Sequence, residues 1–303
     1  MEAPSYPGAQ APERQRTLER AGIALRVHEW GDPQAEPLVL CHGMFDHARG
    51  FDLLAPRLAE RFRVVAFDAR GHGDSSWADS YLWPCDVGDV VAVLRSCERP
   101  AHLVGHSRGG GLATDAAVAA PACVRALVNI DGFGPPPEGF EWPGRDPGPQ
   151  TLPEQLAAFL DWRRSAARRD GWRPYAGLDD LVERRRAQNP RLSREWLRYL
   201  AYHGARRVEG GWVWKADPHA GRSFGPWRPD WIGPGWSPLE APMLAVTGTE
   251  PDTWGPLPEP LIAERLSHVK QVTRARVEGA GHFVHMERPE PTARLLLDFL
   301  EAV

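Results

Sequence analysis

Short apolar runs alternate with amphipathic stretches through the first part of the chain. The apolar runs predict strands at 23–29, 37–41, 64–67, 102–105 and 124–130. Apolar residues at spacings of three and four predict helices at 51–62, 87–97 and 109–120. Strand-helix-strand repetition of this kind forms right-handed crossovers. The fold class is therefore α/β, with a mostly parallel central sheet covered by helices on both faces.

The pattern changes at a stretch rich in Gly and Pro, residues 132–150, which is typical of a boundary between domains. Helical patterns follow this stretch. A second stretch, rich in Pro, Gly and Trp, covers 218–242, and after it the α/β pattern resumes. The resumed pattern predicts a strand at 243–247, a helix at 260–267, a strand at 271–277 and a helix at 289–303. We therefore expect three parts: a flexible N-terminal arm (1–16), an α/β core (17–132 and 241–303) and an inserted helical cap (133–240). The helices expected in the cap are 151–169, 178–188 and 193–207.

Charge and composition narrow the function classes. The 36 basic and 40 acidic residues give a net charge of −4 without a long run of like charges, which argues against nucleic acid as a partner. No apolar segment is long enough to span a membrane, and the polar, Pro-rich N-terminus lacks the apolar region of a secretory signal. The four cysteines lie far apart, which fits neither a zinc site nor a disulfide scaffold. We expect a cytoplasmic protein that binds no metal.

Tryptophan is unusually frequent, and its distribution is uneven. Nine of the 13 Trp residues lie in the expected cap: 142, 162, 172, 196, 212, 214, 227, 231 and 236. Most of them are expected to pack the cap against the core. We hypothesise that two or three also line a pocket and select a substrate with a bulky apolar or aromatic group.

Ser107 is the candidate nucleophile. It lies in the segment VGHSRGG, a G-x-S-x-G pattern preceded by an apolar strand and followed by a helix of small residues. A sharp strand-to-helix turn holds the serine hydroxyl clear of the backbone, and only small flanking residues let the helix pack so close. This context favours nucleophilic catalysis over a simple Gly-rich turn.

A serine nucleophile needs a base, and His282 is the candidate. It lies in the segment GAGHF between a predicted strand and the last helix, so it should reach the same sheet edge as Ser107. His285 is expected to pack at the start of the last helix. His106 directly precedes the nucleophile and is not expected to reach its hydroxyl.

The carboxylate that orients the base has three candidates. Asp252 is preferred, because a short carboxylate at the end of the loop after the strand 243–247 is the usual partner of the histidine. Glu250 lies earlier in the same loop, and Asp131 ends the strand 124–130. Both remain alternatives, with Asp131 otherwise expected to cap the boundary of the insertion.

Acyl transfer also requires donors for the developing oxyanion. The segment LCHGM ends a strand in a glycine turn, so the backbone amide of Met44 can face that of Arg108, the residue after the nucleophile. His42 and Met44 are expected to contribute backbone geometry and pocket wall and not acid-base chemistry.

Together these segments resemble the α/β-hydrolase superfamily, in its serine-nucleophile branch with a helical cap. The resemblance covers residues from about 20 to 303 and rests on motifs in the family's order of serine, acid and histidine. The motifs are His42-Gly43, the segment 68–75 (DARGHGDS), the turn at Ser107, the loop 248–252 and the segment 281–283. The resemblance implies that 68–75 is a structural turn, that Asp252 is the acid and that 210–218 ends the cap. Because the nucleophile is Ser, epoxide-hydrolase and dehalogenase chemistry is disfavoured.

The function predicted from these features is hydrolysis of a carboxylic ester, a thioester or a lactone through an acyl-enzyme. The residues predicted to carry it are Ser107, His282 and Asp252, with the amides of Met44 and Arg108 as the oxyanion hole. No cofactor is expected. Two alternatives stay open: hydrolysis of a carbon-carbon bond or perhydrolysis at the same triad, and a weakly catalytic ligand-binding homologue. The substrate's identity and the oligomeric state are not encoded in these motifs.

Overall fold

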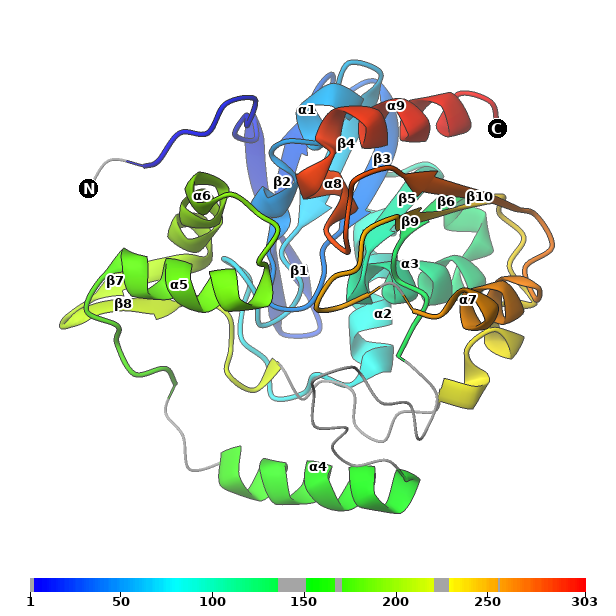
Figure 1. The fold of residues 1–303 in the computed structure, drawn as a ribbon. Helices are drawn as coiled ribbons and strands as arrows, with labels where there is room; N and C mark the ends of the chain where they lie inside the picture. The colour runs from blue at the N-terminus through cyan, green and yellow to red at the C-terminus, as the bar shows by residue number, and fades with distance from the viewer. Residues whose placement is uncertain (1–2, 136–150, 167–170, 221–228, 256) are drawn as a thin grey trace.

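A single eight-stranded sheet organises the chain. The computed structural model describes residues 3–135, 151–166, 171–220, 229–255 and 257–303 (Figure 1). In spatial order the strands are β1 (Arg14–Arg20), β2 (Ile23–Trp30), β4 (Phe62–Phe67), β3 (Glu36–Cys41), β5 (Ala101–His106), β6 (Val124–Ile130), β9 (Met243–Gly248) and β10 (Val272–Val277). β1, β2 and β4 pair antiparallel, and the remaining neighbours pair parallel. The predicted α/β class is confirmed.

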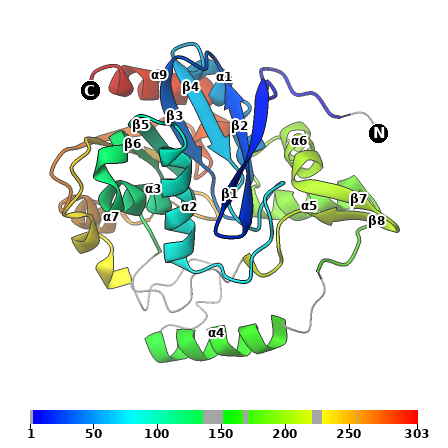
Figure 2. The same cartoon turned by 180° about the vertical axis from the view of Figure 1, so that it is seen from behind.

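Helices cover both faces of the sheet (Figures 1 and 2). Alternate residues of each strand point to opposite faces. In β3, Val39 and Cys41 join one apolar core and Leu38 and Leu40 join the other. The first core is closed by α2 (Trp83–Arg95), α3 (Arg108–Ala119) and α7 (Glu259–Leu266). The second is closed by α1 (Ala55–Leu58), α8 (Val284–Glu287) and α9 (Pro289–Leu300).

The insertion between β6 and β9 has its own elements. They are α4 (Leu152–Ala166), α5 (Leu178–Gln188), α6 (Arg194–Gly204), the hairpin β7 (Ala205–Val208) and β8 (Gly211–Trp214), and the 3-10 turns η4 (Pro229–Trp231) and η5 (Pro234–Trp236). α5 and α6 pack together in a third apolar cluster, which Leu53 and Met286 of the core join. α4 lies apart from the other labelled elements in both views (Figures 1 and 2). Among the described residues, no helix is both long and apolar enough to cross a bilayer.

Two of the predicted helices differ from the structure. The predicted helix 193–207 ends at Gly204, because the following residues pair with β8. The predicted helix 51–62 is reduced to η1 (Ala48–Phe51) and the short α1. Pro56 lies in the first turn of α1, where its missing N–H costs nothing, and it cannot lie deeper in a helix. Most of the predicted linker 132–150 lies outside the described residues.

The N-terminal arm is shorter than predicted. Residues 14–16 belong to β1, an edge strand that alternates between half-buried and exposed positions. Arg16 Nε of β1 lies 2.9 Å from the Glu29 carboxylate on β2. This charge pairing compensates for the few apolar contacts that the polar sequence of β1 can make. Before the strand, the Tyr6 ring lies 4.9 Å from that of Trp196 on α6. The prediction of a flexible arm over 1–16 is therefore wrong for its last three residues.

A buried ion pair links the insertion to the core. Arg185 Nη2 on α5 lies 2.9 Å from Asp46 Oδ1 in the loop after β3, with both side chains less than a tenth exposed. Burial alone would raise the pKa of Asp46, but Arg185 and nearby histidines hold it below the usual value. The ionised pair therefore stabilises the fold above the usual aspartate pKa, and this stabilisation is lost as the pH falls through the lowered value.

We expect Arg185→Met to lower the free energy of unfolding by about 3–5 kcal/mol, because Asp46 would stay buried without a counter-charge. The matched control is Arg186→Met at the neighbouring, 61% exposed position, with an expected change within about 0.5 kcal/mol. Urea denaturation at neutral pH measures both. Equal effects of the two substitutions would contradict the buried pair's contribution.

Candidate active site

Ser107 lies at a strained turn between β5 and α3. Its φ of 54° and ψ of −125° place a non-glycine residue in a region that L-amino acids avoid. The turn is held by hydrogen bonds from the Ser107 N–H to the Ile130 carbonyl (2.9 Å) and from the Gly110 N–H to the Ser107 carbonyl (2.8 Å). The serine is half-buried. The predicted strand-turn-helix context of Ser107 is confirmed.

Two glycines make this turn possible. A Cβ at Gly105 would lie 2.2 Å from the Gly109 carbonyl oxygen, and a Cβ at Gly109 would lie 2.4 Å from the Cys41 carbonyl oxygen. Both distances are impossible for a real side chain, so α3 can only approach β5 and β3 where these positions are glycine. The small residues around Ser107 therefore serve close backbone packing.

His282 is paired with Asp131. The histidine lies in the loop between β10 and α8, and its Nδ1 is 2.6 Å from Asp131 Oδ2, with side chains 7% and 5% exposed. An ionised carboxylate can only accept, so Nδ1 carries the hydrogen and Nε2 is left to act as a base. Within the described residues the Ser107 hydroxyl and the imidazole are not hydrogen-bonded. Such bonds are often long before substrate binds.

The structure corrects the preferred position of the acid. Asp252 does not face the imidazole: its Oδ2 accepts the backbone N–H of His282 at 3.1 Å. The Asp252 N–H donates to the Gly255 carbonyl at 2.8 Å and closes a turn. This turn directs the Asp252 carboxylate to the backbone N–H of His282. Glu250, the other candidate in this loop, accepts a hydrogen bond from the Thr249 hydroxyl at 3.3 Å. Asp131, left open as an alternative, is the carboxylate that contacts the ring.

A buried asparagine presents Asp131 to the histidine. Asn129 donates from Nδ2 to the Gly132 carbonyl (3.1 Å) and accepts the Gly132 N–H at Oδ1 (2.8 Å), so it closes the turn around Asp131. Asp131 has a φ of 49° and its N–H donates to the Val246 carbonyl on β9. Over the pair lies Gly255, where a Cβ would be 2.8 Å from Asp131 Oδ2. The position of Asp131 is thus fixed by its own turn and by the neighbouring strand.

The glycine turn after β3 lies directly beside the nucleophile. A Cβ at Gly43 would be 3.3 Å from the Ser107 Cβ. The His42 imidazole accepts the Ala69 N–H at Nε2 (2.9 Å) and donates from Nδ1 to the Gly43 carbonyl (2.7 Å), and burial lowers its pKa. A neutral ring therefore braces the turn through its two hydrogen bonds. Met44 follows at a half-buried position.

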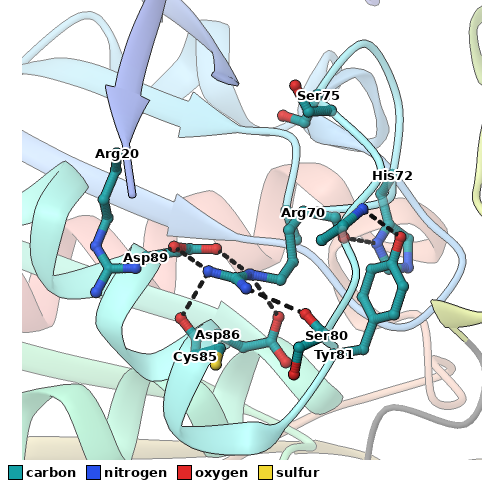
Figure 3. Close-up of polar contacts among 12 residues, drawn as sticks. Arg20, Arg70, His72, Ser75, Ser80, Tyr81, Cys85, Asp86 and Asp89 are labelled. Atoms are coloured by element: carbon teal, nitrogen blue, oxygen red, sulfur yellow. Dashed lines mark hydrogen bonds and ion pairs between the residues drawn. The ribbon is translucent and has the colours of Figure 1, made fainter. Parts of the chain in front are cut away.

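The Arg108 side chain is held by a cluster of buried charges. Its Nη2 lies 2.5 Å from Asp86 Oδ2 on α2, and its guanidinium lies over the Trp83 ring. Figure 3 shows how Arg70 connects Asp86 with Asp89, at distances of 3.7 and 2.6 Å. Burial raises the pKa of Asp86, although Arg108 and Arg70 oppose the shift. The cluster fixes the first turn of α3, where the Arg108 amide lies.

The segment 68–75 is a structural turn, as the resemblance implied. The Asp68 carboxylate accepts the N–H groups of Ala48 (2.7 Å) and Asp74 (2.8 Å). The Ser75 hydroxyl donates to the Asp68 carbonyl. Arg70, from the same segment, belongs to the charge cluster of Figure 3.

The described tryptophans of the insertion mostly serve packing. Trp196 and Trp212 are buried in the cluster of α5 and α6, and buried Trp236 donates to Asp115 on α3. Trp231 is 65% exposed. The residues 142 and 227 and the side chain of residue 162 lie outside the described part of the chain. A pocket-lining role for two or three of the nine stays a prediction.

Among the side chains around His282, Glu287 was not singled out from the sequence. His106 donates from Nε2 to the His282 carbonyl at 2.9 Å, and burial lowers its pKa well below the usual value. Glu287 accepts the N–H of Gly281 at 3.0 Å. His285 is buried against the ring of His106, at 4.5 Å. Glu287 lies on α8, just after the histidine loop, and this closeness in sequence is the only signal that could have indicated it. Within the described residues, no cluster of His, Cys, Asp or Glu is placed to hold a metal ion.

Comparisons with known proteins show what this chain is similar to. The family model described as "Alpha/beta hydrolase family" matches residues 38–295. A serine hydrolase-like protein of Danio rerio is 26% identical over 91% of this chain and 85% of its own length. The 2-(acetamidomethylene)succinate hydrolase of Mesorhizobium japonicum is 28% identical over 95% of both chains. Among solved structures, the thioesterase domain from the curacin biosynthetic pathway superimposes with a TM-score of 0.78 at 22% identity, covering 94% of this chain and 99% of that one.

The strained turn predicts an unusual stability order at position 107. Strained backbone of this type costs about 1–3 kcal/mol, which glycine relieves and alanine does not. Glycine also raises the conformational entropy of the unfolded chain, which offsets part of the stability gained from relieving the strain. We expect Ser107→Gly to be more stable than Ser107→Ala by about 1 kcal/mol, measured as the difference in free energy of unfolding in urea. An alanine variant that is equally or more stable would show that the turn stores no such strain.

Proposed function

The chain belongs to the alpha/beta hydrolase family and is a serine hydrolase, and from this premise we propose that it cleaves a carboxylic ester, a thioester or a lactone through an acyl-enzyme on Ser107. The observation that carries the proposal is the buried contact of 2.6 Å between His282 Nδ1 and Asp131 Oδ2. This contact fixes the tautomer in which Nε2 can take a proton from the serine.

The reaction proceeds in two steps. Ser107 Oγ attacks the carbonyl carbon, while His282 Nε2 accepts the hydroxyl proton and then gives it to the leaving group. The Asp131 carboxylate stabilises the imidazolium that forms. The backbone amides of Met44 and Arg108 hold the oxyanion, an interaction worth about 3–4 kcal/mol for one donor. Water then hydrolyses the acyl-enzyme with the same groups.

The insertion 133–240 serves as a cap that selects the substrate.

Two exposed aromatic side chains of the core support a substrate with a bulky apolar group. Phe45 follows Met44 and is 46% exposed, and Trp254 precedes Gly255 and is 41% exposed. Large exposed apolar side chains beside a catalytic site favour an apolar ligand.

A fluorophosphonate probe tests the nucleophile. We expect the wild-type protein to be labelled covalently at Ser107, because an activated serine attacks the phosphorus and expels fluoride. Ser107→Ala, which removes the hydroxyl, should not be labelled, as judged by intact-protein mass spectrometry. Absence of labelling in the wild type, or equal labelling of the variant, would refute the proposed function.

The role of the acid is tested by two matched substitutions. Asp131→Asn should lower kcat for a p-nitrophenyl ester by about 10⁴-fold, because an amide cannot stabilise the imidazolium and favours the wrong tautomer. Asp252→Asn should lower kcat by at most about 10²-fold, since it disturbs only the placement of the His282 backbone. A greater loss in the Asp252 variant would return the role of the acid to Asp252.

A further inference from the structure

A turn of the insertion contacts the loop that carries His282. Arg191 lies in the connection between α5 and α6, far from that loop in sequence. Its Nε donates to Glu287 Oε2 at 2.7 Å and its Nη2 donates to the Gly279 carbonyl at 3.1 Å. One guanidinium therefore holds both ends of the histidine loop.

The same loop is held by two carboxylates on consecutive peptide groups. Glu287 Oε2 accepts the Gly281 N–H at 3.0 Å, and Asp252 Oδ2 accepts the His282 N–H at 3.1 Å. At Gly281 a Cβ would lie 2.7 Å from both Arg191 Cδ and Asp252 Oδ2. The arginine stem and the two carboxylates thus enclose the backbone immediately before the base.

Arg191 is the counter-charge of the buried Glu287 carboxylate. The Glu287 side chain is 6% exposed, and its Oε1 is buried without a hydrogen-bond partner among the described residues. Within the described residues, the polar contacts of the carboxylate fall on Oε2, from Arg191 and from the Gly281 N–H. Without the arginine, a buried carboxylate would keep one peptide donor and would lie near a second carboxylate, Asp252. Such a group favours water and would draw the loop out of place.

A second contact comes from the same corner of the insertion. The Trp254 indole donates to the Gln188 carbonyl at the end of α5, at 2.9 Å. Trp254 lies in the loop that contains Asp252 and Gly255. The corner 188–191 therefore contacts both loops that position His282.

We infer that Arg191 is a positioning residue for His282, and that through it the docking of the insertion sets the geometry of the base. The inference rests on the proposed role of His282 as base. Arg191 has no place in the chemical step itself, and it acts through Glu287 and the backbone of residues 279–282.

The test compares Arg191→Met with Arg194→Met in the full chain. Arg194, the first residue of α6, is 55% exposed, and its ion pairs within the described residues are with exposed carboxylates, so it is a matched control close to Arg191. With p-nitrophenyl butyrate we expect Arg191→Met to lower kcat by about 10²-fold, the typical cost of a catalytic group displaced by 1 Å. KM should change less than about twofold, because substrate contacts remain. The control should match the wild type.

Hydrogen exchange gives a readout that does not depend on activity. In Arg191→Met, amide exchange should accelerate about tenfold in peptides covering 278–287 and stay unchanged in β5 and β6. If amide exchange rises throughout the chain in Arg191→Met, exchange is measured in Arg191→Lys to decide the question. Lysine keeps the positive charge but loses the second hydrogen bond, to the Gly279 carbonyl. An intermediate effect confined to 278–287 then supports the inference, and an unaffected loop overturns it.

Unchanged kcat together with unchanged exchange in Arg191→Met would also overturn the inference. A wild-type protein that does not react with the fluorophosphonate probe would refute the proposed function instead. In that case the exchange measurement still decides whether Arg191 holds the loop. The two failures are therefore distinguishable.

Discussion

The active site depends on the side-by-side pairing of four parallel strands. β5, β6, β9 and β10 are consecutive neighbours in the sheet, so their carboxyl ends meet at one edge. Ile130 pairs with His106 on one side and with Val246 on the other, and Val277 pairs with Gly248. The residues that follow these strand ends are the proposed nucleophile, acid and base. Because the hydrogen-bond ladders set the spacing of the strands, residues distant in sequence come together at this edge.

Every polar group of His282 that the structure joins to another residue is held by a different segment. The ring Nδ1 contacts Asp131, the backbone N–H contacts Asp252 and the backbone carbonyl contacts His106. In a buried site each lost partner leaves a donor or acceptor unsatisfied, which costs about 1–3 kcal/mol. The ring can rotate or shift only by breaking several of these bonds. The arrangement explains how a loop residue keeps the fixed orientation that a base requires.

Buried charge pairs connect the insertion and the nucleophile turn to the rest of the core. Arg185 pairs with Asp46 beside the glycine turn, and Arg108 pairs with Asp86 on α2. Pairs of this kind add little net stability, because desolvation opposes the attraction, but breaking one leaves a costly buried charge. They therefore act as geometric constraints. They hold the loops around the site in one arrangement, while the apolar cores supply most of the stability.

The sequence alone was enough to predict the fold class, the strand-turn-helix context of Ser107 and the position of His282 in the edge loop. These features are local: a strand-to-helix turn needs small residues in fixed positions around Ser107, and apolar periodicity marks the strands. The choice between Asp131 and Asp252 was decided only by the tertiary structure. Each acid follows one of two neighbouring strands, β6 and β9, so both reach His282, and only loop geometry directs one to the ring and the other to the backbone. The contact of Arg191 also depends on a partner remote in sequence, and no local pattern encodes it.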